Sequence, residues 1–334
     1  MNRKPKKLLN NPHDVPAEQL EGLIYACGGK LVKVEGYSGV YHNAIAENKP
    51  VLVTGGGSGH EPMFAGYVGS GLADAAALGE IFASPSPDII IATAKVAEKG
   101  KGVLFVYGCY AGDNMNFDIA AELLEEEGIP VRTVRVTDDI SSAPLSKISE
   151  RRGVAGDMYV LKIAGAAIAA GYDLEAAHTV TEKANFNTRS MGVALGPCSI
   201  PETGKFNFEL ADDELELGMG IHGEPGVRRQ KMTNADDING EIIERLCEDI
   251  ELKAGDKVCL TINNLGASTY TELFIANRKV HQELEKRGIS VYDTYIGSYC
   301  TSQEMAGYSV TIFRLDDELQ QLYDMPCDSF KWRK

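Results

Sequence analysis

The sequence predicts an α/β protein with two α/β domains, the first a parallel sheet flanked by helices and the second a smaller mixed sheet with helices. A chain of 334 residues is long for a single hydrophobic core. In its first half, short β-branched runs alternate with helical patterns, which is typical of a parallel sheet. The second half repeats these signals more loosely. We place the boundary where helical periodicity lapses, giving domains 1–187 and 188–334.

The elements of the first domain follow from its hydrophobic pattern. Apolar runs bounded by glycine or proline predict strands at 51–54, 103–107 and 131–136. Before the last of these, Phe117, Ala120 and Leu124 fall on one face of a helix predicted over 116–127. Gly128 ends that helix, since glycine readily adopts the left-handed backbone that closes one.

The second domain shows the same kinds of signal. Its predicted strands lie at 257–262, 290–296 and 308–314. A stripe of apolar residues four apart predicts a helix before the first strand: Ile238, Ile242, Leu246 and Ile250. Thr269 and Glu272 have the spacing of a capping box, so a second helix begins there and ends near Gly288.

Composition excludes several classes of function. The 33 basic and 48 acidic residues give a formal net charge of −15, which disfavours binding to nucleic acid or anionic membranes. The longest apolar window, 163–171, is too short to span a bilayer, and the basic N-terminus lacks the apolar region of a signal peptide. Seven scattered cysteines without a CxxC pair indicate buried thiols rather than disulfides or zinc ligands. We therefore expect a cytoplasmic protein.

The first motif with chemical content is GGGSGHEP at 55–62. It contains neither GxxxxGK[ST] nor a complete GxGxxG, so nucleotide binding by this loop is disfavoured. After a strand, such glycines let backbone N–H groups approach a ligand, and we expect Gly57, Ser58 and Gly59 to bind a small polyhydroxy substrate. His60 would then exchange a proton with it. The alternative is a tight loop in which His60 only packs its own turn.

The second and third motifs repeat this arrangement. In YGCYAGDNMNF, at 107–117, Gly108 and Asp113 follow a predicted strand at the edge where catalytic residues of α/β proteins gather. The alternative for Asp113 is an N-terminal helix cap. In GMGIHGEPG, at 218–226, His222 is flanked by glycines rather than by the apolar neighbours of a core histidine. Metal binding is the alternative there, but no HExxH or compact ligand set exists, and we expect no metal.

Six motifs in this order make the chain recognisable. They are GGGSGHEP, AGDNMNFDIAAELL (111–124), RRGVAG (151–156), GIHGEPG (220–226), NNLGAS (263–268) and GSYCTSQEMAGYSVTI (297–312). Over nearly its whole length the sequence resembles the substrate-binding subunit of dihydroxyacetone kinases. The resemblance implies a cytoplasmic homodimer that holds a short-chain ketose while a separate subunit supplies the phosphoryl group. This chain would bind no cofactor, because ATP or ADP with Mg²⁺ would sit on the partner, or a phosphotransferase-system protein would be the donor.

The same resemblance implies roles for three residues. The imidazole of His222 would add to the substrate carbonyl and form a covalent hemiaminal. His60 and Asp113 would hold and deprotonate the hydroxyl that is phosphorylated. Covalent capture would select ketoses over polyols such as glycerol, because an alcohol offers no electrophilic carbon.

Two positions depart from the family pattern. Gly108 stands where members that phosphorylate dihydroxyacetone commonly carry a lysine, and Phe64 stands where a histidine is common. Two hypotheses follow. The chain is a kinase subunit for dihydroxyacetone or a somewhat larger keto sugar, such as erythrulose or a branched ketose. Alternatively, it is a non-catalytic ketose sensor that acts as co-activator of a transcription regulator.

Overall fold

The computed structural model describes residues 5–334, which fold into two compact units. What we call the first unit consists of Leu8–Val136, Asp157–Asn185 and Glu318–Lys334. The second unit consists of residues 5–7, Thr137–Gly156 and Phe186–Asp317. The sequence predicted a single boundary after residue 187; helix α5 ends at Phe186, and the chain passes between the two units near residues 8, 137, 157, 186 and 318.

The first unit is built on a six-stranded sheet, counted over residues 5–334. Its strands are, in sheet order, β1 (Leu31–Lys33), β2 (Gly39–His42), β5 (Ala75–Ile81), β3 (Val51–Ser58), β6 (Val103–Gly108) and β7 (Val131–Val136). The last four are mutually parallel, as predicted. Strands β1 and β2 form an antiparallel hairpin at one edge, because the five residues between them are too few for a parallel crossover.

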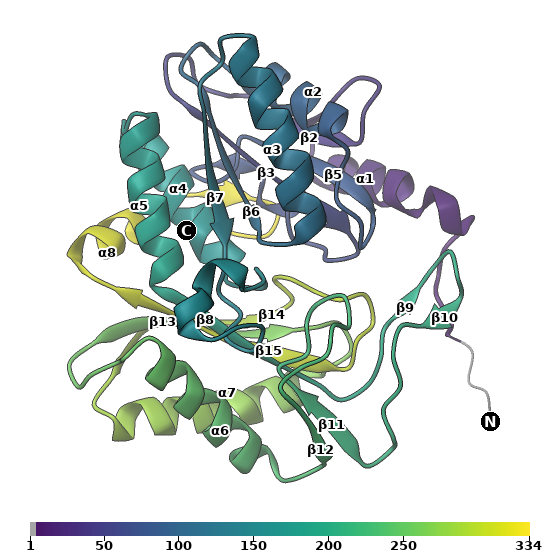
Figure 1. Cartoon of the computed structure of the whole chain (residues 1–334), viewed down its shortest axis with the longest axis vertical. Coiled ribbons are helices and arrows are strands. Elements are labelled where there is room, and N and C mark those ends of the chain that lie inside the picture. Colours follow the sequence, from purple (N-terminus) through teal and green to yellow (C-terminus); the bar gives the residue numbers. More distant parts are fainter. Residues whose placement is uncertain (1–4) are drawn as a thin grey trace. The chain divides into compact units, whose positions relative to one another are not determined.

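Helices cover both faces of this sheet. Helices α2 (Pro87–Ala97) and α3 (Ala111–Glu126) lie side by side on one face, where Ile90, Phe117 and Leu124 pack on the strands (Figure 1). Helix α4 (Asp157–Ala169) also contacts β3 and β6, and it is buried on every side. This explains why the residues of α4, apart from Asp157 and Lys162, are apolar all round rather than along one stripe.

The C-terminal segment belongs to the first unit because it packs on α4. The buried ammonium of Lys162 donates hydrogen bonds to the carbonyls of Leu322 (3.2 Å) and Met325 (2.8 Å), at the end of helix α8 (Asp317–Asp324). The ring of Trp332 lies 5.9 Å from that of Tyr159. These contacts join residues about 160 positions apart, which a local sequence pattern does not reveal.

The second unit is built on another sheet, with six strands within residues 5–334. In sheet order they are β12 (Arg228–Lys231), β11 (Glu214–Leu217), β8 (Thr188–Ala194), β15 (Gly307–Leu315), β13 (Lys257–Asn264) and β14 (Ser290–Gly297). Only the β13–β14 pair is parallel. The sheet is therefore mixed, as predicted, but it has as many strands as the first. The three strands predicted for this half correspond to β13, β14 and β15.

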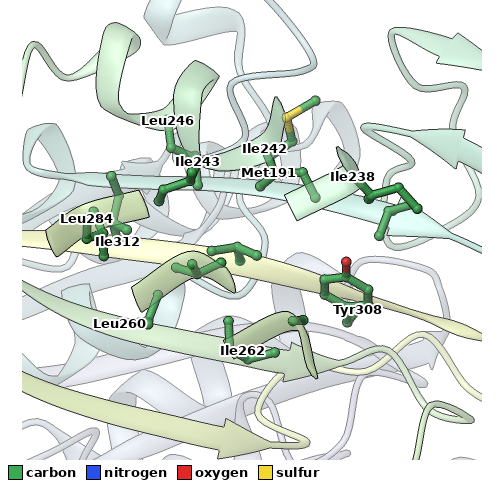
Figure 2. Packing of buried hydrophobic residues seen from close by; sticks show 14 of the residues in the cluster. Met191, Ile238, Ile242, Ile243, Leu246, Leu260, Ile262, Leu284, Tyr308 and Ile312 are labelled. Atoms are coloured by element: carbon green, nitrogen blue, oxygen red, sulfur yellow. The ribbon is translucent and has the colours of Figure 1, made fainter. Parts of the chain in front are cut away.

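Two helices cover one face of the second sheet. In Figure 2, Ile238, Ile242 and Leu246 of helix α6 (Ala235–Asp249) point toward the side chains of the strands. Helix α7 (Tyr270–Lys286) lies beside α6 and carries the predicted capping box. The Thr269 hydroxyl and the Glu272 carboxylate each bind the other residue's backbone N–H there.

The remaining elements are short or peripheral. They are α1 (Val15–Ala26), α5 (Leu174–Phe186), the 3-10 helices η1 (Pro12–Asp14), η2 (Ala65–Tyr67) and η3 (Leu145–Glu150), and the two-residue strands β4 (Gly69–Ser70), β9 (Ser199–Ile200), β10 (Lys205–Phe206) and β16 (Asp328–Ser329). Within the described part of the chain, no helix combines the length and apolarity that a bilayer crossing requires.

Candidate active site

In the first unit, three parallel strands have their carboxyl ends on the same side of the sheet. The loop after β5 forms hydrogen bonds with the segments that follow the other two strands. The Ser58 hydroxyl donates to the Gly79 carbonyl (2.7 Å), and the Phe82 N–H donates to the Ser58 carbonyl (2.8 Å). On the other side of this loop, the Asn116 amide of α3 donates to the Pro85 carbonyl (2.9 Å). The segments that follow β3 and β6 are thereby fixed beside each other. The first motif was expected to lie after its strand, but residues 55–58 belong to β3, and only the rest of the motif follows it.

His60 lies in this edge and is almost completely buried, with 1% of its surface exposed. Its ring stacks on that of Phe82, with centroids 4.9 Å apart and planes 22° apart. The Gly59 N–H donates to both carboxylate oxygens of Glu61 (2.9 and 3.1 Å), which fixes the turn around the imidazole. The packing role that we considered as an alternative is thus part of what His60 does. Proton transfer by His60 stays a prediction.

The glycines of β3 make room for protein neighbours. A Cβ at Gly56 would overlap the ring of Phe64, and one at Gly57 would lie 2.7 Å from the backbone nitrogen of Ala83. Real Cβ atoms do not approach other atoms so closely. Close packing of the β5 loop on β3 therefore requires the small residue at Gly57. Substrate binding by Gly57, Ser58 and Gly59 stays a prediction.

Asp113 lies in the first turn of α3, which begins at Ala111, five residues earlier than the sequence pattern predicted. Tyr110 occupies the N-cap position, so the alternative of Asp113 as the cap is wrong. A carboxylate in a first turn is stabilised by the partial positive charge at that end of a helix. Gly108 is the buried last residue of β6, paired with Val136 of β7. Both residues therefore lie at the same sheet edge as His60.

His222 belongs to the second unit and lies in the loop between β11 and β12. Its Nδ1 is 2.9 Å from Oε1 of Glu224, and its backbone N–H donates to Oε2 of the same carboxylate (2.9 Å). The His222 carbonyl accepts from the Asn207 amide (2.8 Å). The preceding carbonyl, that of Ile221, accepts from the Ser302 hydroxyl. The loop therefore holds the imidazole in one orientation while 23% of the side chain stays exposed.

Glu224 is the acidic residue of this loop. Burial opposes its ionisation, but the hydrogen bond of His222, the positive charge of that ring when it is protonated and the charge of Arg152 lower the pKa of Glu224 to about 2. When the carboxylate accepts a hydrogen bond from Nδ1–H, the lone pair of a neutral imidazole lies on Nε2. The sequence analysis gave no role to Glu224 or Arg152. The His-Gly-Glu spacing was the signal for Glu224, and the only signal for Arg152 was its place in the RRGVAG motif.

The structure thus brings six of the predicted site residues to one edge of one unit: Gly57, Ser58, Gly59, His60, Gly108 and Asp113. His222 lies in the other unit. A site that His222 shares with His60 and Asp113 stays a prediction. Among residues 5–334, no group of three or more His, Cys, Asp or Glu side chains is placed to hold a metal ion.

The fold and the loops define a class of protein: two α/β units, one with glycine-rich loops at the ends of parallel strands and one with a carboxylate-bound imidazole. Comparison with known proteins identifies the family. The chain belongs to the Dak1 domain family, which matches residues 21–331. This confirms the resemblance to dihydroxyacetone kinase subunits.

Relatives of two kinds match nearly the whole chain. The dihydroxyacetone-binding subunit of a PTS-dependent dihydroxyacetone kinase of Listeria innocua is 44% identical over 97% of this chain and 98% of its own length. An L-erythrulose kinase of Pectobacterium atrosepticum is 42% identical over 98% of this chain, which spans 56% of that enzyme. Among solved structures, a co-activator of a dihydroxyacetone kinase operon matches with a TM-score of 0.90 and 33% identity, over 95% of this chain and 98% of that one.

Proposed function

We propose that this chain is the ketose-binding subunit of a dihydroxyacetone-kinase-type phosphotransferase. The observation that carries the proposal is the 2.9 Å contact between His222 Nδ1 and Glu224, since it leaves the lone pair of a neutral imidazole on Nε2. The close kinase relatives support it. The protein would act in the cytoplasm as a homodimer.

Capture begins when Nε2 of His222 donates its lone pair to the ketose carbonyl carbon. The π electrons of the C=O bond move to oxygen, which takes up a proton, and the ring loses its Nδ1 proton, so that the hemiaminal is neutral. Glycerol has no such carbon and is not captured. Fixing the carbonyl also orients the terminal hydroxyl, and orientation of this kind is worth up to about 7–11 kcal/mol of barrier.

Phosphoryl transfer follows on a complex with the donor. Asp113 or His60 takes the proton of the terminal hydroxyl, whose oxygen forms the new bond to phosphorus while the bond from phosphorus to the donor breaks. The donor is a separate subunit that carries ATP or ADP with Mg²⁺, or a phosphoprotein of a sugar phosphotransferase system. The name of the Listeria innocua relative favours the second donor.

The substrate is dihydroxyacetone or a four-carbon or branched keto sugar such as erythrulose. The absence of a side chain at Gly108, where relatives that use the triose commonly carry lysine, leaves room for a larger ketose. The erythrulose kinase relative supports this extension of the substrate range.

A second candidate function rests on the match to an operon co-activator. In that case the chain would capture a ketose through His222 and pass the signal to a transcription regulator without phosphorylating the sugar. Asp113 and His60 argue for the kinase, because a sensor needs only the capturing histidine.

One experiment separates the two. The purified chain is incubated with dihydroxyacetone, erythrulose and glycerol, and its intact mass is measured. It is then supplied with the cognate donor subunit and either ATP or a phosphoenolpyruvate-driven relay. The proposal expects a mass increment with the ketoses alone, followed by a sugar phosphate. Capture without transfer from either donor would favour the sensor, and no capture of any ketose would refute both.

A further inference from the structure

An ion-paired arginine that the proposed reaction does not use lies against the loop of His222. Arg152 comes from the RRGVAG motif, and its side chain is 13% exposed. Its Nε donates to Oδ2 of Asp139 (2.9 Å), and its Nη2 contacts the same oxygen (2.7 Å). Nη2 also donates to the carbonyl of Gly218 (3.2 Å), the residue that opens the histidine loop. The guanidinium is therefore fixed against this loop.

The rest of the guanidinium lies close to Gly220, where there is no room for a side chain. A Cβ at Gly220 would come within 2.6 Å of Arg152 Nη1, and it would also overlap Oε2 of Glu224. The guanidinium of Arg152 and the carboxylate of Glu224 thus both pack against the backbone at Gly220. Burial raises the pKa of Glu224, but the hydrogen bond and charge of His222 lower it, and the charge of Arg152 adds a smaller contribution in the same direction.

Asp139 completes the arrangement from the other side. Its side chain is 3% exposed, and its Oδ1 accepts from the Ser141 N–H (2.9 Å). The Asp139 N–H in turn donates to the Arg152 carbonyl (3.1 Å). Asp139, Arg152, Glu224 and His222 therefore form a series of alternating charge that ends at the imidazole.

We propose that Arg152 is a positioning residue for His222, acting through Glu224. This inference rests on the proposed function, in which Nε2 is the nucleophile. The positive charge of Arg152 near Gly220 favours the ionised form of Glu224, which accepts the hydrogen bond from the ring, so that Nδ1 holds the proton and Nε2 carries the lone pair. As the bond from Nε2 to carbon forms, positive charge develops on the ring, and the same carboxylate stabilises it.

The neighbouring arginine has a different role. Arg151 is directed to Asp249, with which it forms a bidentate ion pair, and it is 1% exposed. A better control is Arg229, whose Nη2 lies 3.0 Å from the buried carboxylate of Glu216. That carboxylate accepts from the Gly226 N–H (2.8 Å) at the far end of the same loop. Removing Arg229 therefore perturbs an ion pair between the two strands that flank this loop without touching Glu224.

The test compares Arg152→Gln, Arg152→Lys and Arg229→Gln with the wild type in the full-length protein. The first readout is the tautomer of His222, from nitrogen chemical shifts of isotope-labelled histidine without substrate. The second is the dihydroxyacetone concentration that gives half-maximal adduct in intact mass spectra. For Arg152→Gln we expect loss of the Nδ1–H tautomer as the main form and an increase of about tenfold or more in that concentration. Arg152→Lys should recover part of both, and Arg229→Gln should match the wild type.

Arg152→Gln that keeps the Nδ1–H tautomer and the wild-type half-saturation would overturn the proposal. If Arg152→Gln fails to fold, the Lys variant decides, because a point charge without the fork of Arg should give an intermediate tautomer population. If the wild type itself forms no adduct, the proposed function fails. The tautomer readout still decides whether Arg152 positions the ring.

Discussion

Arg151 and Asp249 form a bidentate ion pair across 98 positions of the sequence, with Nη1–Oδ1 and Nη2–Oδ2 distances of 2.8 and 2.6 Å. The Nε of Arg189, which is fully buried, donates to the same carboxylate at 2.5 Å. Two guanidinium groups thus share one acid at the end of α6. Burial opposes ionisation of Asp249, yet the two arginines lower its pKa.

Asp249→Asn should therefore destabilise the protein strongly. The substitution removes the carboxylate that pairs with two buried cations, and breaking a buried ion pair typically costs about 3–5 kcal/mol. The free energy of unfolding in urea measures this. Asp236→Asn, at the exposed start of the same helix and paired with Arg278, is the matched control and should cost less than about 1 kcal/mol. Equal losses in the two variants would contradict the account.

Lys162 should make stability rise with pH above neutrality. Burial lowers its pKa to about 8 from the ordinary 10.5. Between these values the unfolded chain binds more protons than the folded one, so the free energy of unfolding increases with pH in that window. Integrated over it, the difference between the wild type and Lys162→Met should grow by up to about 3 kcal/mol in favour of the wild type.

Urea unfolding at several pH values from 7.5 upward measures that difference. Lys95→Met removes an exposed lysine of the same unit, which pairs with Glu127. It should show a much smaller pH-dependent difference. If the difference in unfolding free energy between the wild type and Lys162→Met does not change with pH, the pKa of Lys162 is not lowered in the folded protein.

Asp113→Asn should separate capture from turnover. An amide keeps the shape of the carboxylate in the first turn of α3 but cannot take a proton from the substrate hydroxyl. Loss of a general base typically lowers kcat about 100-fold or more. The ketose adduct in the intact mass should stay as in the wild type, while formation of sugar phosphate falls.

His222→Ala is the complementary variant. It should abolish the mass increment and allow glycerol to compete with the ketose. Asp113→Asn with unchanged turnover would remove Asp113 from the mechanism. An adduct that persists in His222→Ala would place the capturing nucleophile elsewhere.

Gly108→Lys should shift preference from larger ketoses to dihydroxyacetone. Gly108 is not among the glycines with positive φ, so a side chain is compatible with its backbone. The lysine would occupy the space proposed for a fourth carbon. We expect the ratio of kcat/KM for erythrulose to that for dihydroxyacetone to fall about tenfold or more. Gly22→Lys, at an open position on α1 of the same unit, should leave the ratio unchanged. An unchanged ratio in Gly108→Lys would exclude Gly108 as a specificity determinant.

Much of the candidate site could be predicted because its residues lie in short motifs. His60, Asp113 and His222 each follow a strand and have glycines close by in the sequence. Such a local pattern can be recognised from the sequence alone. The start of α3 was predicted too late, because the sequence Ala111, Gly112 and Asp113 is typical of a loop. Their N–H groups lie in a first turn, where side-chain caps are common but not obligatory, and here Tyr110 makes no such cap.

By itself, the sequence determined the class of fold, six of the twelve strands of the two large sheets, the helices α6 and α7 of the second unit and the capping box of Thr269 and Glu272. All of these depend on hydrogen bonds or hydrophobic periodicity within a few residues. Only the tertiary structure decided that residues 318–334 pack on α4 and that Arg152 lies against the loop of His222. Such contacts join segments tens to hundreds of residues apart, and their free energy comes from burial and charge pairing, which no local pattern specifies.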